Sequence, residues 1–253
     1  MHIFSCTHEF NSIMTCLYRA CASHLPNKEV YLCYEPIEQM NLFDEYTHVD
    51  PDPELAAKLM DLIHTRISSD FYEYFALAAL SYEDAALDLM YRMLLLGFHH
   101  GPAVLSMRQY KEVCDFLGVR ERVSKEVYRF QEFTRFHEVR KGVYIAHIEP
   151  RHAIVQALGG IFEDRMPSEH FMIVDDIHRD AVIHMRDEHF YYRTLDSAEF
   201  EELLKTEQMN DEYTDLWKVF FESIAIKQRE NYRCQRNLMP LWSRKHAVEF
   251  MNR

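Results

Sequence analysis

The residues most able to do chemistry include a Glu-Pro-Arg-His motif at positions 149–152, which lies at the end of a predicted strand. His147 lies on that strand and His137 on the neighbouring one. Three imidazoles and a carboxylate can form a metal site. Glu149 or His152 can instead contact a substrate or partner, or serve as acid and base. Because 15 His in one chain cluster easily by chance, we predict no metal site and no cofactor.

An acidic pair, Asp175 and Asp176, falls in a predicted loop between two strands. Adjacent carboxylates can hold Mg²⁺ or share a proton between them. A solvated turn is the simpler interpretation of such a pair. If the protein is an enzyme, both residues are further acid and base candidates.

The C-terminal part of the chain carries a second group of candidates, on a stretch from 211 to 236 that we predict to be one long helix. At 100° per residue, Arg229, Arg233 and Arg236 lie within about 60° of one another. We call these three residues the arginine stripe. It can contact phosphate, or it can simply complement the helix dipole.

The opposite side of this predicted helix is apolar over its first half, with Trp217, Phe220, Phe221 and Ile224. We expect Trp217 and Phe221 to pack into the core. Asn231 and Gln235 continue this side, and buried amides each need a hydrogen-bond partner. These two residues are therefore either structural contacts or part of a recognition surface.

Beyond this helix, Arg244 and Lys245 lie between Trp242 and His246. Basic and stacking side chains together suit phosphate and base contacts, and they suit a disordered tail or a protein partner equally well. Residues 225–253 contain seven Lys and Arg against two Glu. The whole chain has 28 Lys and Arg against 41 Asp and Glu, with a net charge of −13, which argues against a general nucleic-acid coat.

Several activities lack their sequence motifs in this chain. It lacks both glycine patterns that bind nucleotides, Gly-x-x-x-x-Gly-Lys-Ser/Thr and Gly-x-Gly-x-x-Gly. It also lacks the Gly-x-Ser-x-Gly nucleophile elbow and the zinc-deaminase motif, His-x-Glu with a paired Pro-Cys-x-x-Cys. The six cysteines are scattered, and the Cys-x-x-x-Cys-x-x-Cys spacing of a radical S-adenosylmethionine (SAM) cluster is missing. We therefore expect buried free thiols, and any radical chemistry would take place on another chain.

The hydrophobic periodicity predicts an α+β protein with two differently built halves. The first half has strands at 2–6 and 30–34 around a helix, then a helical middle with helices near 53–68, 69–80, 83–97, 106–117 and 121–133. The second half has an antiparallel sheet, with strands at 136–139, 143–149, 170–174, 181–185 and 189–192, a helix at 153–165 and the long C-terminal helix. We predict domains at 1–133 and 134–253, or one compact unit.

The N-terminus shows neither a basic region nor a long apolar run, and no apolar run approaches the roughly 20 residues that cross a bilayer. We therefore expect a cytoplasmic protein without a membrane partner.

Two segments carry a family resemblance. The first is Phe133-Thr134-Arg135-Phe136-His137-Glu138 followed by Gly142-Val143-Tyr144-Ile145-Ala146-His147-Ile148-Glu149-Pro150. The second runs from Leu216-Trp217-Lys218 through Ile224-Ala225-Ile226, Arg229, Asn231 and Gln235 to Met239-Pro240. They resemble a bacterial family of DNA metabolism proteins, whose members are encoded beside a radical SAM protein of DNA modification or repair. A related domain of unknown function also occurs fused to uracil-DNA glycosylase-like domains. This chain has Arg151 where the family usually has an acidic residue.

The resemblance implies an accessory protein of DNA metabolism or repair that binds nucleic acid and acts with a radical SAM partner. The nucleic-acid contacts would come from Arg135, Arg229, Asn231, Arg233, Gln235, Arg236, Arg244 and Lys245. Two alternatives stay open. The chain is itself an enzyme acting on nucleic acid, with Glu149 and His152 as acid and base, or it is an assembly subunit whose basic tail docks on an acidic protein.

Overall fold

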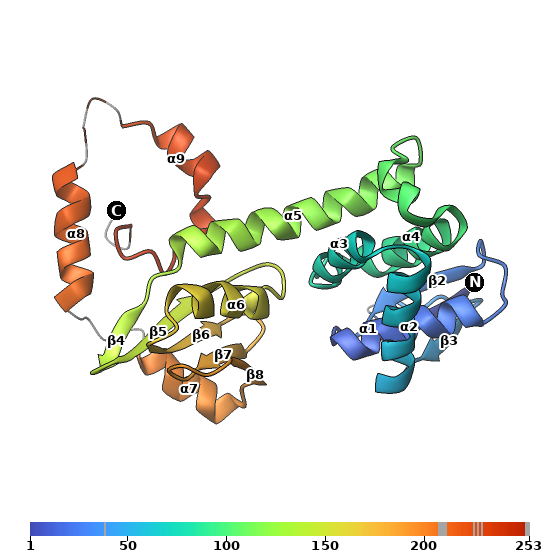
Figure 1. Ribbon diagram of the computed structural model, residues 1–253, viewed down its shortest axis with the longest axis horizontal. Coiled ribbons are helices and arrows are strands. Elements are labelled where there is room, and N and C mark those ends of the chain that lie inside the picture. The colour runs from blue at the N-terminus through green and yellow to red at the C-terminus, as the bar shows by residue number, and fades with distance from the viewer. Residues whose placement is uncertain (38, 207–211, 225, 227, 229, 251–253) are drawn as a thin grey trace. The chain divides into compact units, whose positions relative to one another are not determined.

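The computed structural model describes residues 1–37, 39–206, 212–224, 226, 228 and 230–250 (Figure 1). The chain divides into two compact units, Met1–Ser124 and Lys125–Arg253. The division falls inside helix α5 (Lys111–Phe133). Each unit has its own sheet and its own apolar core.

A three-stranded parallel sheet opens the first unit. It contains β1 (His2–Cys6), β2 (Val30–Tyr34) and β3 (Glu45–His48), in the order β2-β1-β3. Helix α1 (Phe10–Ala22) joins β1 to β2, so the predicted strand–helix–strand is confirmed. Strand β3 was not predicted. It is a mostly exposed edge strand of sequence Glu-Tyr-Thr-His, and it lacks the apolar alternation that marks a half-buried strand.

Helices make up the rest of the first unit: α2 (Pro53–Arg66), α3 (Ser69–Ala79), α4 (Ala86–His100), the short 3-10 helix η1 (Gly101–Ser106) and the first part of α5. The Asp52 side chain caps α2, because its Oδ1 accepts from the amides of Glu54 and Leu55 at 3.0 and 3.2 Å. The two helices predicted near 106–117 and 121–133 form the single helix α5. Buried apolar side chains continue through the predicted break: Phe116, Val119, Val123, Val127 and Phe130.

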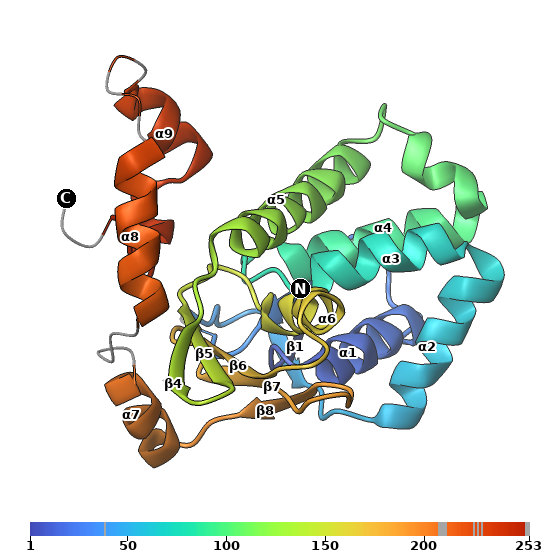
Figure 2. The ribbon, with the colours of Figure 1, turned by 60° about the vertical axis from the view of Figure 1, so that its left-hand side comes forward.

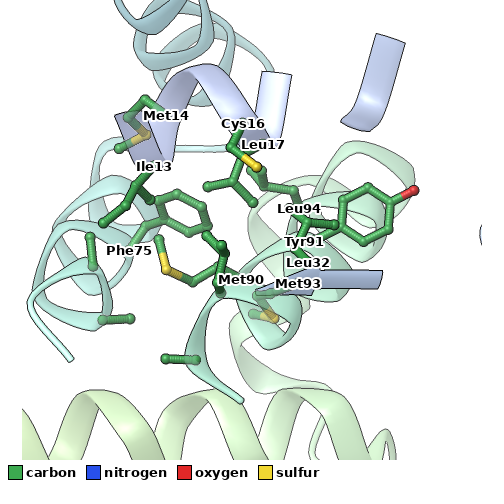
Figure 3. Packing of buried hydrophobic residues seen from close by; sticks show 14 of the residues in the cluster. Ile13, Met14, Cys16, Leu17, Leu32, Phe75, Met90, Tyr91, Met93 and Leu94 are labelled. Carbon is green, nitrogen blue, oxygen red and sulfur yellow. The ribbon is translucent and has the colours of Figure 1, made fainter. Parts of the chain in front are cut away.

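The core of the first unit lies between α1, β2, α3 and α4. Figure 3 shows Ile13, Leu17, Phe75, Met90 and Leu94 pointing toward one another from these elements. All five side chains are at most 1% exposed. Burial on this scale dominates the stability of a domain of this size.

A five-stranded mixed sheet forms the centre of the second unit. Its strands are β4 (His137–Arg140), β5 (Val143–Ile148), β6 (His170–Asp175), β7 (Asp180–His184) and β8 (Tyr191–Thr194), in the order β4-β5-β6-β7-β8. The prediction of an antiparallel sheet is wrong for one pair, because β5 and β6 run parallel. Helix α6 (Val155–Arg165) connects them, and such a crossover returns the chain in its original direction.

Helices pack on both faces of this sheet (Figure 2). On the side of α6, the ring of Phe136 packs edge-on against the rings of both Phe162 and Phe171. On the other side, α7 (Ser197–Thr206) brings Phe200 and Leu203 against a cluster that includes Ile145 and Val174. The central strands β5, β6 and β7 are therefore covered on both faces, as is typical where a parallel pair is present, whereas the edge strand β8 is exposed.

The long C-terminal helix predicted over 211–236 is absent. The described residues instead form two helices, α8 (Glu212–Ile224) and α9 (Tyr232–Leu238), followed by η3 (Leu241–Ser243). Asn231 begins the new helix, because its backbone is extended and its Oδ1 accepts from the Cys234 amide at 3.0 Å. A short amide side chain that bonds the backbone in this way favours a helix start over a helix interior.

Of the helices in the described part of the chain, none combines the length and the apolar content that crossing a bilayer requires. The six cysteines are all free thiols. Cys6 and Cys16 are buried, whereas Cys114 and Cys234 are exposed.

Two neighbouring glycines in α6 allow a paired test of packing against the sheet. A Cβ at Gly159 would lie 3.0 Å from the Phe190 ring and 3.1 Å from Val182, whereas a Cβ at Gly160 would meet nothing closer than 3.8 Å. Alanine gains about 1 kcal/mol of helix propensity at either site, but overpacking costs about 1–3 kcal/mol. We expect Gly159→Ala to lower the free energy of unfolding and Gly160→Ala to keep or raise it, measured by urea denaturation. Equal effects of the two changes would contradict the packing described here.

Candidate functional site

The parallel pairing of β5 and β6 places two carboxylates at one edge of the sheet. Ile148 and Asp175, the last residues of these strands, are partners in the register. The amide of Asp176 donates to the carbonyl oxygen of Ile148 at 2.9 Å. Glu149 and Asp176 therefore leave the sheet side by side, at the carboxyl ends of parallel strands, where ligands bind in many α/β folds.

His246, from the C-terminal segment, completes this group. Its Nε2 lies 3.6 Å from Asp176 Oδ2 and 3.9 Å from Glu149 Oε1. The ligand atoms of the three residues all lie within 4.8 Å of one another. We call Glu149, Asp176 and His246 the edge cluster. Two carboxylates and an imidazole can hold a divalent metal ion or exchange a proton.

His147 supports the edge cluster from within the sheet. Its Nδ1 lies 2.9 Å from Asp176 Oδ1, and its Nε2 lies 3.4 Å from Thr206 Oγ1 at the end of α7. The side chains of His147 and Asp176 are only 1% and 6% exposed. A buried carboxylate needs such a partner, because desolvating an unpaired charge is costly. This contact also fixes which oxygen of Asp176 faces His246.

Lys245 introduces a cation on the open side of the cluster. Its ammonium group forms an ion pair with Glu149 Oε1, while 60% of its side chain stays exposed. The carboxylate of Glu149 is therefore shared between a lysine at the surface and the buried part of the cluster.

Trp242 anchors the segment that supplies Lys245 and His246. Two guanidinium groups contact its ring, with Arg151 at 4.4 Å and Arg129 at 5.3 Å from the ring centre. It also contacts Phe130 of α5, with ring centres 6.2 Å apart. Stacking of this kind holds the C-terminal segment against α5 and the Glu-Pro-Arg-His motif.

Glu149 and His152, the predicted acid and base, have different surroundings. His152 is 7% exposed and its Nε2 lies 3.8 Å from Glu126 Oε2. Glu126 accepts a hydrogen bond from the amide of Arg151, and burial raises the pKa of its carboxyl group. His152 therefore faces α5, whereas Glu149 faces the C-terminal segment.

The adjacent side chains of Asp175 and Asp176 also lie in different surroundings. The interpretation of this pair as a solvated turn is wrong. Asp175 is fully buried, and its Oδ1 accepts from the amides of Ile177 and His178, both at 3.0 Å. Its Oδ2 lies 2.6 Å from His178 Nδ1. Asp175 therefore shapes the turn between β6 and β7, and only Asp176 reaches the edge cluster.

Three of the predicted nucleic-acid contacts are engaged within the protein. Arg135 pairs with the buried carboxylate of Glu249 at 2.8 Å and stacks on Trp217 at 5.1 Å. Arg244 donates to the carbonyl oxygen of Met239 at 2.8 Å and lies over Phe250. Lys245 pairs with Glu149, as described above. These cations stabilise the C-terminal segment.

Four of the remaining predicted contacts lie on α9 or cap it. Arg233 and Arg236 are exposed on this helix, whereas Gln235 is half-buried. Asn231 is exposed and caps the helix. Arg229 lies outside the described residues. Arg233 and Arg236 are therefore the two residues of the arginine stripe that the structure describes.

Helix α8 differs from the prediction in how its apolar residues are divided. Leu216, Val219, Phe220 and Ile224 lie at helical spacing and are 50–65% exposed. We call these four residues the α8 stripe. Trp217 is 37% exposed, so the prediction that it packs into the core is wrong, and Phe221 is half-buried with its ring edge-on to Phe250. The sequence pattern had placed Trp217, Phe220, Phe221 and Ile224 together on one apolar side of the helix, with Trp217 and Phe221 expected in the core.

Sequence reasoning also missed the edge cluster, although it had named Glu149, Asp176 and His246 separately. A usable signal was present in the predicted strand–helix–strand over 143–174. A helix between two strands of one sheet favours parallel pairing, which brings the two strand ends together.

Burial of Asp175 leads to a test by pH. Burial raises the pKa of Asp175 in the folded state, while the unfolded chain keeps a value near 3.9. The folded state therefore binds the proton more tightly, and stability falls as pH rises through the interval between the two pKa values. We expect urea denaturation to show the wild type losing stability relative to Asp175→Asn as the pH rises from about 4 to 7. Parallel pH profiles would show that Asp175 titrates alike in both states.

Comparison with models of protein families gives one match, to DUF4130, a domain of unknown function, over residues 84–249. The matched region contains α5, the mixed sheet, the edge cluster, the α8 stripe and α9. No curated protein matches the chain. Since the match covers more than half of the sequence, the chain belongs to the DUF4130 family.

Proposed function

We propose that this protein is an accessory protein of DNA metabolism or repair, which binds nucleic acid and acts with a radical SAM partner. One observation carries the proposal. Two consecutive helices of the C-terminal segment expose side chains suited to two kinds of macromolecule, apolar ones on α8 and arginines on α9. The sequence resemblance described above supplies the identity of the partner.

The α8 stripe suits a protein partner. Its four side chains are large and at least half exposed, and they follow one side of a three-turn helix. Contiguous exposed apolar side chains of this kind typically mark an interaction surface. Trp217 and the Arg135 guanidinium lie at its margin, and aromatic and arginine side chains are enriched in protein interfaces.

The two arginines of α9 suit phosphate. Arg233 and Arg236 are one turn apart and exposed, and the ring of Tyr232 beside them is 63% exposed. An exposed cation pair with a neighbouring aromatic ring fits a backbone phosphate and a stacked base. The other cations named for this role, Arg135, Arg244 and Lys245, have acidic, carbonyl or aromatic partners inside the protein.

The α8 stripe gives the first test of the proposal. Leu216→Asp with Val219→Asp should weaken co-purification with the radical SAM protein by about tenfold or more, because charges would be buried at the interface. The melting temperature should stay unchanged, since both side chains are mostly exposed. Leu42→Asp with Phe43→Asp, two residues more than 90% exposed in the first unit, is the matched control. Undiminished co-purification of the α8 variant would exclude this surface.

The arginines of α9 give the second test. If both contact phosphate, the slope of log K against log salt should become less negative by about 1.5–2 in Arg233→Gln with Arg236→Gln. Lys28→Gln with Arg66→Gln removes the same charge from exposed positions of the first unit and should leave the slope unchanged. The assay is DNA binding over a salt series, with and without the partner. Wild type that binds neither single- nor double-stranded DNA at low salt would contradict the proposal.

The edge cluster favours a second candidate, an enzyme acting on nucleic acid. Glu149 with Asp176 and His246 offers acid and base groups at a strand edge, while His152 lies against Glu126. A product-forming activity that is lost in Glu149→Gln and kept in the α9 variant would favour this alternative. Partner binding without any DNA binding would favour the assembly subunit instead.

A further inference from the structure

The geometry of the edge cluster is close to that of a metal site. Ligands bound to one ion at about 2.0–2.2 Å lie about 3–3.5 Å from one another. His246 Nε2 lies 3.6 and 3.9 Å from the two carboxylates, which is longer than a hydrogen bond and only a few tenths of an ångström longer than a ligand separation. The ligand atoms of the three residues all lie within 4.8 Å of one another, so side-chain rotations that draw the two carboxylates together would let all three reach one ion.

We infer that Glu149, Asp176 and His246 form a binding site for a divalent transition-metal ion. Two carboxylate oxygens and one imidazole nitrogen suit Mn²⁺, Fe²⁺ or Zn²⁺ better than Mg²⁺, which prefers oxygen ligands alone. Three protein ligands leave coordination positions open for water or for an oxygen of a bound phosphate. The inference replaces the sequence-based expectation of no metal.

Two ligands of this site are held in place by the fold. Glu149 and Asp176 follow strand ends that are fixed in register. His147 occupies Asp176 Oδ1, so that Oδ2 is the oxygen facing His246. A metal-binding carboxylate is commonly oriented by a hydrogen bond of this kind. The third ligand, His246, comes from the segment anchored by Trp242.

Charge balance supports a cation at this point. Asp176 is almost completely buried and Glu149 is 23% exposed, so their negative charges are partly removed from water. Lys245 supplies one compensating charge through its ion pair with Glu149. An incoming metal ion would compete with this ammonium for the same carboxylate. Removing the lysine charge should therefore strengthen metal binding, the opposite of what removing a ligand does.

The experiment uses the full-length protein, freed of metal with a chelator and titrated with Mn²⁺ alone. Electron paramagnetic resonance of free Mn²⁺ measures affinity, and spin-echo modulation detects a coordinated ¹⁴N. We expect one Mn²⁺ per chain with ¹⁴N modulation in the wild type. Affinity should fall at least about tenfold in Asp176→Asn and in Glu149→Gln, and the ¹⁴N modulation should disappear in His246→Gln.

Two further variants distinguish Mn²⁺ binding at this site from a general attraction of Mn²⁺ to an acidic protein. Lys245→Gln should bind Mn²⁺ several-fold more tightly. His189→Gln changes a histidine that contacts Glu163 at 2.7 Å elsewhere in the same unit, and it should bind like the wild type. Absence of stoichiometric binding, or equal binding by the wild type and all three ligand variants, would overturn the inference. Glu149 is partly exposed, so its variant tests the site even if Asp176→Asn fails to fold.

The inference stands apart from the proposed function, because metal binding is measured without DNA or a partner. The salt series of the α9 variant can be measured in chelator. If metal binding is absent, DNA binding can therefore still be measured, and the reverse also holds. If both hold, the open coordination positions offer a phosphate oxygen a second point of attachment besides the arginines of α9.

Discussion

Strands β5 and β6 run parallel because α6 carries the chain back across one face of the sheet between them. Everything near the edge cluster depends on that pairing. In an antiparallel pair, Glu149 and Asp176 would leave the sheet at opposite edges. The parallel register brings them to the same edge, where His147 of β5 contacts both Asp176 and Thr206 of α7. A single topological constraint thus brings Asp176 to His147, which lies 29 positions earlier in the chain.

Burial of carboxylates explains how the rest of the second unit is organised around this edge. Glu126, Asp175, Asp176 and Glu249 are all shielded from water, and each such charge needs compensation. Three partners come from distant segments: the amide of Arg151 for Glu126, His147 for Asp176 and Arg135 for Glu249. The partner of Asp175 is local, because His178 is three residues further along the chain. The pair of Arg135 with Glu249 and the pair of Lys245 with Glu149 hold the C-terminal segment against the sheet.

This use of cations bears directly on function. A basic tail on an acidic protein suggests a nucleic-acid contact, yet two of the tail's four described Lys and Arg residues have partners inside the protein: Lys245 pairs with Glu149, and Arg244 bonds a carbonyl oxygen and lies over Phe250. The other two, Arg233 and Arg236 on α9, are exposed. The large exposed side chains of α8 point instead to a protein partner. The C-terminal segment therefore combines an interior structural role with two exposed surfaces.

Local pattern alone determined most of the elements of this protein. The strands at 2–6 and 30–34, the cap and start of α2, and the strands and helix between 137 and 184 follow from periodicity and turn residues, which depend on neighbours in the chain. The break before α9 is also local, because Asn231 Oδ1 accepts from the amide of Cys234, three residues further along the chain. Two features depended on tertiary structure. The parallel register of β5 and β6 is a choice between strand pairings, which no single segment encodes. The meeting of Glu149, Asp176 and His246 needed both the parallel register and the docking of Trp242, because contacts between distant segments form only when burial and charge pairing outweigh the entropy of closing the chain.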